Sequence, residues 1–571
     1  MSDLGELALV RQLPPGMLLM LGALVVPWLP RRLGQAAMVL LPALGLAHVL
    51  LLPDGLVMAT QLGGYELEVV RVDRLSRVFG IIFQLAALLA GIYSLHVVDR
   101  MQQAASLAYA GSAIGALFAG DLITLFVYWE LTAITSVFLI WASRTERAFR
   151  TGLRYLVIQV GSGVLLLAGA ALHVGQTGSL AFGHIGIESP GGLLILLAFG
   201  MKAAFPFLHN WLQDAYPEAT VTGTVWLSVF TTKLAIYALA RGFAGTDILI
   251  PIGAAMTVFP IFYAVLENDM RRVLSYSLNN QLGFMVVGIG IGTELALNGA
   301  VAHAFAHILY KSLLFMAMGA VLLRTGTIRA SELGGLYKSM PLTAALCIVG
   351  SLAISAFPLF SGFVTKSMVM TAVADGHMTV ILFALLFASA GVMDHSGIKI
   401  PFFTFFAHDS GKRPQEAPWH MLLAMGVAAF LCIAIGIVPG PLYALLPYPV
   451  DYAPYTSTHV VTQMQLLCFA ALAFVVLMRT RLYPPELPSR NLDFDWTYRR
   501  ALPWLVAKVR RHGGQIWDEQ KALGVWTVQQ VIRLTRASAS PHTTLGEPWL
   551  TGRSALWAAL LLLAILALDF L

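Results

Sequence analysis

The chain has 571 residues, of which 58% are hydrophobic and 12% are charged, and its mean hydropathy is +0.76. Soluble domains carry roughly 25% charged residues, so this composition excludes an ordinary soluble enzyme. It also excludes a disordered chain, and three cysteines without a Cys-x-x-Cys pair exclude a disulfide scaffold. Because about 20 apolar residues span a bilayer as a helix, we predict an all-α polytopic membrane protein.

Apolar runs follow one another along almost the whole chain. We expect about 14–16 transmembrane helices from these runs. The runs lie near 16–30, 35–53, 77–98, 104–120, 122–142, 153–173, 192–213, 219–241, 247–266, 272–292, 296–323, 341–373, 377–407, 419–446, 462–478 and 554–570.

Charge is concentrated between Arg479 and Arg553, where twelve basic and six acidic residues account for the whole net charge of +6. Basic segments beside membrane spans usually face the cytoplasm, and the arginines and lysines of the other loops favour the same orientation. Residues 480–495 are rich in proline and typical of a linker. Residues 515–536 show helical amphipathicity, which predicts a helix along the membrane surface or along a neighbouring protein.

Six ionisable residues lie well inside the apolar runs. At about 2.5–3.5 kcal/mol each, they would together cost on the order of 18 kcal/mol if they faced lipid, more than the roughly 5–15 kcal/mol that holds a domain folded. They must therefore pair, contact water or lose their charge, and they are functional candidates. A single lysine could instead extend to the interface, and Lys399 is equally compatible with a structural role. The six are Glu130, Lys202, Lys233, Lys311, Lys366 and Lys399.

Two of these lysines accompany prolines in similar sequence. Pro206 follows Lys202 by four residues, so it removes the hydrogen bond to the Lys202 carbonyl and should break the helix there. Ala-Phe-Pro recurs at Pro358, 152 residues later, with Lys366 after it. An ordinary proline kink is the alternative, but paired broken spans with lysines indicate an internal repeat of about five spans, which is typical of transporters.

His303, His307 and Lys311 are spaced four residues apart and share one helical face. Histidine exchanges protons near neutral pH, so the three form a candidate proton relay. Core histidines bonded to the backbone are the alternative, and the spacing supports neither a zinc nor a haem site. Glu130 is the expected partner of Lys202, with a structural salt bridge as its alternative.

Four motifs carry a resemblance to a known family. Tyr128–Leu131, Gly200–Leu212, Asp269–Ser277 and His303–Lys311 resemble the antiporter-like subunits of respiratory complex I and of Mrp-type cation/proton antiporters, over about residues 75–450. Lys366, together with Gly-Ile-Lys-Ile-Pro around Lys399, is most similar to the D-type subunits of Mrp antiporters. The amphipathic segment and the further span at the C-terminus depart from a compact D-type subunit.

The resemblance implies two inverted five-helix repeats, each with a broken helix. Glu130 and Lys202 would form a first ion-paired site, Lys233 would connect it to the relay of His303, His307 and Lys311, and Lys366 would lie at the exit. The expected domains are 1–103 (N-terminal helices), 104–241 and 247–407 (the two repeats), 408–479 (C-terminal helices), 480–553 (basic cytoplasmic segment) and 554–571 (final helix).

The sequence thus predicts a proton-translocating membrane subunit of a multisubunit Na⁺/H⁺ antiporter in a bacterial inner membrane. Its partners would be other membrane subunits, protons, Na⁺ and lipid, and neither nucleic acid, cofactor nor metal is expected. The alternatives are a non-redox subunit of a complex I-like dehydrogenase or membrane-bound hydrogenase, and a membrane partner in inorganic-carbon uptake. An integral membrane enzyme with Glu130 as its base is the alternative from another class.

Overall fold

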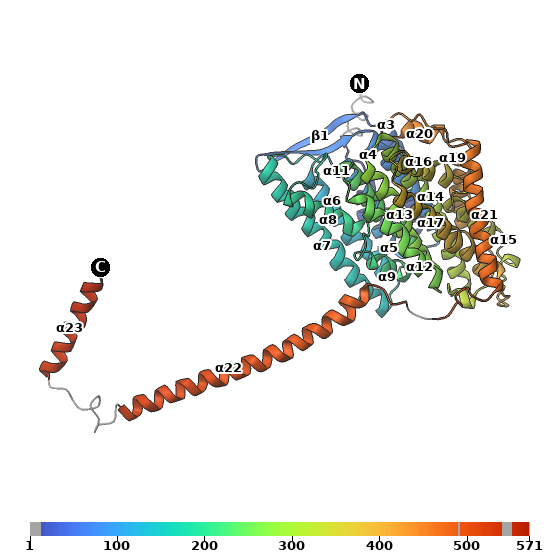
Figure 1. The fold of residues 1–571 in the computed structure, drawn as a ribbon. Helices are drawn as coiled ribbons and strands as arrows, with labels where there is room; N and C mark the ends of the chain where they lie inside the picture. Colours follow the sequence, from blue (N-terminus) through green and yellow to red (C-terminus); the bar gives the residue numbers. More distant parts are fainter. Residues whose placement is uncertain (1–12, 489–490, 539–550, 570–571) are drawn as a thin grey trace. The chain divides into compact units, whose positions relative to one another are not determined.

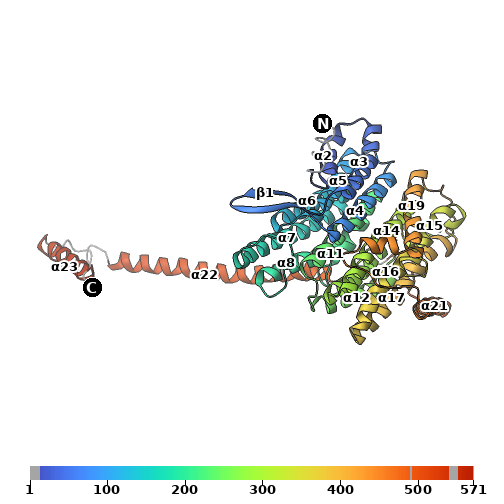
Figure 2. The same cartoon turned by 90° about the horizontal axis from the view of Figure 1, so that it is seen from above.

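The computed structural model describes residues 13–488, 491–538 and 551–569, and the chain divides into unit 1 (Met1–Asn491) and unit 2 (Leu492–Leu571). Unit 1 is a bundle of helices (Figure 1). Seen from above, α7 and α8 lie on one side of unit 1 and α15 and α21 on the opposite side (Figure 2). Eleven helices of the described residues are long and apolar enough to cross a membrane, which confirms the all-α polytopic fold.

The helices of unit 1 follow the predicted apolar runs, and several begin at a side chain that caps them. Asp99, Asp121 and Asp269 accept hydrogen bonds from the first free N–H groups of α5, α6 and α13, as N-cap residues do. The helices that precede the first broken span are α2 (Met17–Val25), α3 (Arg31–Leu51), α4 (Arg74–Tyr93), α5 (Arg100–Phe118), α6 (Leu122–Trp141) and α7 (Glu146–Thr177).

The remaining helices of unit 1 include two spans that are broken in the middle, α8/α9 and α15/α16. Their bounds are α8 (Pro190–Lys202), α9 (Asn210–Ala215), α10 (Val221–Val229), α11 (Thr231–Gly242), α12 (Leu249–Leu266), α13 (Met270–Ile291), α14 (Glu294–Thr325), α15 (Pro341–Ile354), α16 (Ser361–Asp375), α17 (Thr379–Val392), α18 (Lys399–Pro401), α19 (Trp419–Ile437), α20 (Gly440–Leu445) and α21 (Ser457–Arg479). Two π-helical segments, Met393–Ile398 and Phe402–Phe406, flank α18.

The two broken spans share their backbone conformation, residue for residue. Ala204 and Phe207 have φ of 61° and 70°, and Ala356 and Leu359, each 152 positions later, have φ of 57° and 75°. At both breaks an N–H donates over 3.0 Å to the carbonyl five residues back, from Phe205 to Gly200 and from Phe357 to Leu352. The repeated Ala-Phe-Pro sequence therefore corresponds to a repeated helix break in the structure.

The elements that precede each broken span repeat as well. Both α7 and α14 have 32 residues, begin after a capping threonine and end at a left-handed glycine. Isolated β-bridges join Asp121 to Ala181 and Asp269 to Arg329, again at matching positions 148 residues apart. The bundle thus contains two copies of one chain path.

A β-hairpin that the apolar runs did not predict lies between α3 and α4. Its antiparallel strands β1 (Gly55–Leu62) and β2 (Tyr65–Val72) are joined at Gly63 and Gly64, which have φ of 58° and 86°. The Gly120 N–H donates to the Glu68 carbonyl over 2.8 Å, and Arg71 donates to the Phe182 carbonyl. The hairpin therefore covers the turn that precedes α6.

Unit 2 contains a π-helical turn (Thr497–Ala501), α22 (Leu502–Ser538) and α23 (Thr551–Asp569). The 37-residue α22 includes the predicted amphipathic segment and extends well before it. The apolar side chains of its predicted face are all exposed within unit 2, by 46% to 63%. These side chains are Trp517, Val528, Val531 and Ile532.

An ion pair connects the start of α4 to the end of α11. Arg241 donates to both carboxylate oxygens of Asp73 over 2.8 and 2.7 Å, and Asp73 also caps α4 through Ser76. Burial alone would raise the pKa of Asp73, but the Arg241 guanidinium and the Ser76 hydrogen bonds outweigh it and hold the pKa below its usual value.

Replacing Asp73 with Asn should lower the free energy of unfolding by about 1 kcal/mol at pH 7, because Asn preserves the cap but not the ion pair. A depressed pKa stabilises the folded state above the unfolded-state value of about 3.9. That stabilisation is lost as the pH falls through the folded-state pKa. In detergent, the melting temperature of the variant should therefore be lower than that of wild type at pH 7, and the two melting temperatures should converge at low pH. Asp54→Asn, at an exposed pair with Arg77, is the control; equal melting of Asp73→Asn and wild type at pH 7 would contradict the account.

Candidate functional site

The predicted basic residues are buried in protein. Seven side chains on five different helical elements are each at most 3% exposed, and Glu130 is half-buried. None of the seven therefore faces lipid, as the cost of burying a charge in hydrocarbon requires. They are Lys202, Lys233, His303, His307, Lys311, Lys366 and Lys399.

The first site lies where α8 breaks. Lys202 is the last residue of α8, and its Nζ donates to the Trp129 carbonyl over 2.6 Å and to Thr132 Oγ1 over 3.0 Å, both on α6. The amine also lies 4.4 Å from the centre of the Trp129 ring. In the described part of the chain, no ion pair within 4 Å joins it to Glu130, whose carboxylate contacts Gly163 of α7. The expected direct Glu130–Lys202 ion pair is thus not formed here: the Lys202 amine is held by Trp129 and Thr132, which flank Glu130 in the sequence of α6.

Glu130 nevertheless lies within electrostatic range of Lys202. One of its carboxylate oxygens is buried, and among the described residues that oxygen has no hydrogen-bond partner. Buried carboxylate oxygens normally find a donor. The carboxylate is therefore poised to take up a proton or a partner without breaking an existing bond.

Lys233 lies on α11 just after the junction with α10, and its Nζ donates over 2.6 Å to the Ser228 carbonyl at that junction. Buried hydroxyl groups extend from here toward the first site. Tyr109 and Thr231 are 2.6 Å apart, and Tyr155 and Ser136 are 2.8 Å apart. Ser136 lies one turn of α6 after Thr132, which accepts a hydrogen bond from the Lys202 amine.

The α14 face carries His303, His307 and Lys311, as predicted. His303 Nε2 lies 3.1 Å from Gln281 Oε1 on α13, and His303 Nδ1 lies 3.2 Å from Thr365 Oγ1 on α16. The interpretation that these are core histidines bonded to the backbone does not hold for His303, since both of its ring nitrogens contact side chains of other helices.

His307 and Lys311 differ from His303 in the hydrogen bonding of their nitrogen atoms. Within the described part of the chain, neither ring nitrogen of His307 nor the Lys311 amine has a hydrogen-bond partner, although all are buried. His307 lies within electrostatic range of Lys233, Lys311 and His303. Lys233 on α11 and the α14 residues therefore belong to one cluster.

Lys366 on α16 extends this cluster to the second broken span. Its Nζ lies 4.3 Å from the centre of the Phe284 ring and within electrostatic range of His303. His395, in the first π-helical segment, lies within range of Lys311, Lys366 and Lys399. Its Nδ1 contacts Ser396 Oγ, which in turn donates to Ser277 Oγ over 2.7 Å.

Lys399 is held at the far end of the cluster by three oxygens. Its Nζ donates to the carbonyls of Val265 and Glu267 over 2.6 and 2.8 Å, and lies 2.8 Å from Glu486 Oε1. The carboxylate was not expected, because residues 480–495 were interpreted as a linker. Residues 482–488 form no helix or strand, as expected for a linker, but Tyr483 in this segment is buried and the Glu486 side chain is 8% exposed.

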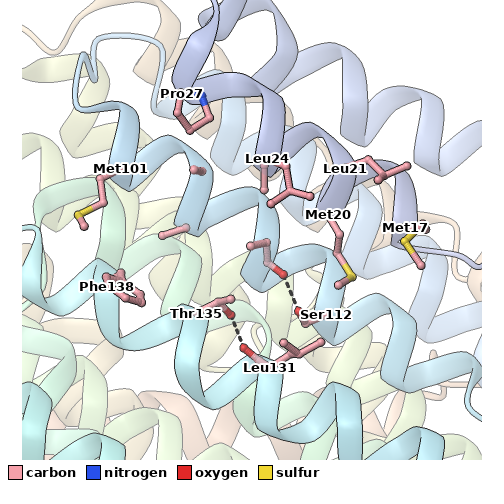
Figure 3. Close-up of a pocket in the computed structure, with 14 residues that line it drawn as sticks. Met17, Met20, Leu21, Leu24, Pro27, Met101, Ser112, Leu131, Thr135 and Phe138 are labelled. Atoms are coloured by element: carbon pink, nitrogen blue, oxygen red, sulfur yellow. Dashed lines mark hydrogen bonds between the residues drawn. The ribbon is translucent and has the colours of Figure 1, made fainter.

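A large apolar pocket lies away from this polar cluster, between α2, α5 and α6 (Figure 3). Its volume is about 610 Å³, and its lining includes Met20, Leu24 and Phe138. The lining hydroxyls of Ser112 and Thr135 donate to carbonyls of their own helices over 2.7 and 2.6 Å. The pocket therefore offers no group for proton exchange or ion binding.

Several polar residues that complete the cluster escaped the sequence analysis. Hydroxyl side chains lower the hydropathy of a span much less than lysines do, so they did not stand out from the apolar runs. Gln281, His395 and Glu486 were missed because their contacts come from distant parts of the chain. The run Ser275–Gln281 inside a predicted span was the available signal for α13. The residues missed are Ser136, Tyr155, Tyr109, Thr231, Gln281, Tyr310, Thr365, Ser277, His395 and Glu486.

Comparison with known proteins agrees with this geometry. Residues 119–391 match the family model described as NADH:quinone oxidoreductase/Mrp antiporter, TM. The D subunit of the Na(+)/H(+) antiporter of Alkalihalophilus pseudofirmus is 31% identical over 355 residues, which cover 58% of this chain and 71% of that protein. The A/B subunit of the probable K(+)/H(+) antiporter of Rhizobium meliloti is 29% identical over 401 residues, but this chain spans only 40% of its length.

A solved structure of the Mrp complex from Dietzia sp. contains a chain with the same fold. The TM-score is 0.76 at 25% identity, and the match covers 91% of this chain and 62% of the other. Together with the family model and the Alkalihalophilus relative, this match identifies the protein: the chain belongs to the family of antiporter-like membrane subunits shared by Mrp-type antiporters and NADH:quinone oxidoreductases.

Proposed function

We propose that this chain is the proton-translocating membrane subunit of a multisubunit Mrp-type cation/proton antiporter in a bacterial inner membrane. The observation that carries the proposal is the series of buried basic side chains that runs from the first broken span to the second. Buried charges of this kind in membrane proteins mark ion pathways and proton relays. The functional core would be the two repeats, residues 104–241 and 247–407.

Protons would enter at Glu130 and Lys202, beside the first broken span. The hydroxyls of Ser136, Tyr155 and Thr231 would carry them toward Lys233. From there the path would follow His307, Lys311 and His303 to Lys366. Buried polar atoms without a protein partner, as at His307 and Lys311, are groups that internal water commonly satisfies, and water would complete the path.

Movement along the path would follow from charge repulsion. A proton bound at Lys311 disfavours a second proton on Lys233 or His307, because like charges in a low-dielectric interior repel strongly. Occupation of one site therefore displaces a proton from the next. Flow would be coupled to counter-movement of Na⁺ elsewhere in the complex, with the other membrane subunits as partners.

The test uses the assembled complex in inside-out membrane vesicles that hold an imposed pH gradient reported by a fluorescent amine. We expect addition of Na⁺ to dissipate the gradient, and addition of choline at equal ionic strength not to. A response to K⁺ and not to Na⁺ would mean that the coupling ion is K⁺ instead of Na⁺. A gradient that no cation dissipates would contradict the antiporter proposal.

The long helix of unit 2 favours a second candidate, a proton-pumping subunit of a dehydrogenase-like or hydrogenase-like complex. A helix of 37 residues with an exposed apolar face fits a brace laid along neighbouring subunits, which a complex driven by a distant redox reaction would need. The proton path would be the same in both candidates. Identification of the subunits that copurify with the chain distinguishes them.

Replacing both Arg533 and Arg536 with Glu should reduce the yield of assembled complex several-fold, because it reverses the charge of the polar face of α22. Proton transport per assembled complex should change by less than about twofold. The matched control reverses two charges on unit 1, at Arg150 and Lys412. Native gel analysis measures the yield; an unchanged yield for the α22 variant would refute a bracing role.

A further inference from the structure

The segment that follows α21 (Figure 1) turns back into unit 1 and delivers a carboxylate to Lys399. The turn is made by Arg481, with φ of 60°, and by the N–H groups of Leu482 and Tyr483, which both donate to the Leu477 carbonyl over 3.0 Å. The Tyr483 ring then packs against Phe403 and Phe474 at centroid distances of 6.1 and 5.0 Å. Packing of Tyr483 thus anchors the segment that carries Glu486.

Three oxygens surround the Lys399 amine. Two are the carbonyls of Val265 and Glu267, at the end of α12, and the third is Glu486. A carbonyl oxygen accepts a hydrogen bond but does not take up the proton, whereas a carboxylate does both. If one proton leaves Lys399, the remaining two N–H groups still match the two carbonyls.

Other charged groups surround this pair. Asp394, in the first π-helical segment, lies within electrostatic range of both Lys399 and Glu486. Glu267 lies close to both, and it contacts Arg272 at 4.0 Å and Asn491 at 3.3 Å. His395 also faces Lys399. Three acids around one buried lysine and one arginine leave negative charge in excess, which favours retention of a proton here.

The helix that carries Lys399 is interrupted on both sides. The π-helical segments Met393–Ile398 and Phe402–Phe406 leave only three residues of α-helix between them. Such interruptions occur frequently at functional sites, because they redirect side chains and free backbone groups.

Burial raises the pKa of Glu486, although the Lys399 ammonium opposes this effect. The carboxylate therefore takes up a proton more readily than an exposed glutamate.

We propose that Glu486 is the proton acceptor of Lys399 and forms with it the last exchange pair of the path. The N–H bond of the Lys399 ammonium breaks, its proton forms an O–H bond on Glu486, and a neutral amine and a neutral carboxylic acid result. Release of the proton from Glu486 to water at the surface, and arrival of the next proton at Lys399 from His395, restore the pair. This inference rests on the proposed proton transport and adds its terminal step.

The test compares Glu486→Gln with wild type in vesicles that contain the assembled complex, with proton flux measured from pH 6 to pH 9. The amide keeps the size and polarity of the side chain but takes up no proton, so we expect the flux to fall by about 100-fold, the scale of a lost proton-transfer group. Glu486→Asp, which keeps a carboxylate on a shorter arm, should restore part of the flux and alter its pH profile. Glu332→Gln, at an exposed pair with Arg329, is the control.

A double variant covers the outcome in which Glu486→Gln fails to assemble. Lys399→Gln with Glu486→Gln removes both charges, so no unpaired charge stays buried, and it should assemble without flux. Flux within about twofold of wild type in either variant would overturn the inference while leaving the proposed function intact. Absence of flux in the wild-type complex would instead remove the proposed function itself.

Discussion

Replacing Lys202 with Met is expected to reduce cation-dependent proton flux by about 100-fold or more, the scale of a lost proton-transfer group. Methionine retains much of the volume of lysine but has no titratable amine. The structural cost should be small, because the Trp129 carbonyl that loses the Lys202 donor still receives the Thr132 hydroxyl over 2.7 Å. Complex yield should therefore stay near that of wild type.

The control for this variant is Lys338→Met. Lys338 lies on the surface of unit 1, where it pairs with Asp409 at 2.9 Å, and its loss should leave the flux unchanged. Flux is measured in vesicles by the decay of the pH gradient after Na⁺ addition, normalised to the amount of complex. Near-normal flux in Lys202→Met would count against the first site, whatever the result elsewhere on the path.

Replacing Lys311 with Met is expected to abolish flux to a similar extent while the protein becomes no less stable. The amine is buried, and among the described residues it has no hydrogen-bond partner. Burying an amine among protein costs free energy even where internal water contacts it, and an apolar side chain of similar volume avoids that cost. The melting temperature in detergent should therefore be equal to or higher than that of wild type.

This combination separates a lysine that serves transport alone from one that also stabilises the fold. Lys399→Met is the comparison, because it removes a lysine held by three oxygens and should lower the melting temperature by leaving Glu486 buried without its cation. A drop in stability for Lys311→Met as large as that for Lys399→Met would show that Lys311 has a structural partner. It would then contradict the role of Lys311 in the relay.

The sequence alone was sufficient to predict the features that follow from local chemistry. Pro206 fixes φ and lacks an N–H, so a break at Lys202 could be predicted from two residues, and the structure places the helix end there. The spacing of His303 and His307 predicts a shared face because it follows the helical period. The cost of burying charge predicts that the lysines face protein, and all of them do.

Features that depend on distant parts of the chain could not be predicted in this way. Glu486 reaches Lys399 only because α21 ends near the π-helical segments, and no local pattern encodes that approach. Lys202 contacts Trp129 and Thr132 rather than Glu130 because the Glu130 carboxylate lies against Gly163 of α7, a packing choice that no local pattern encodes. The β-hairpin could not be predicted because the burial of β2 does not alternate regularly between buried and exposed residues.

The proposed transport requires that the buried amines and imidazoles form one connected, hydrated path. The most direct measurement is an electron-microscopy map of the assembled complex at a resolution that shows ordered water. The account predicts water within hydrogen-bond distance of Glu130, His307 and Lys311, linked through hydroxyl and amide side chains from Lys202 to Lys366. Dry, separate pockets around these three residues would contradict it.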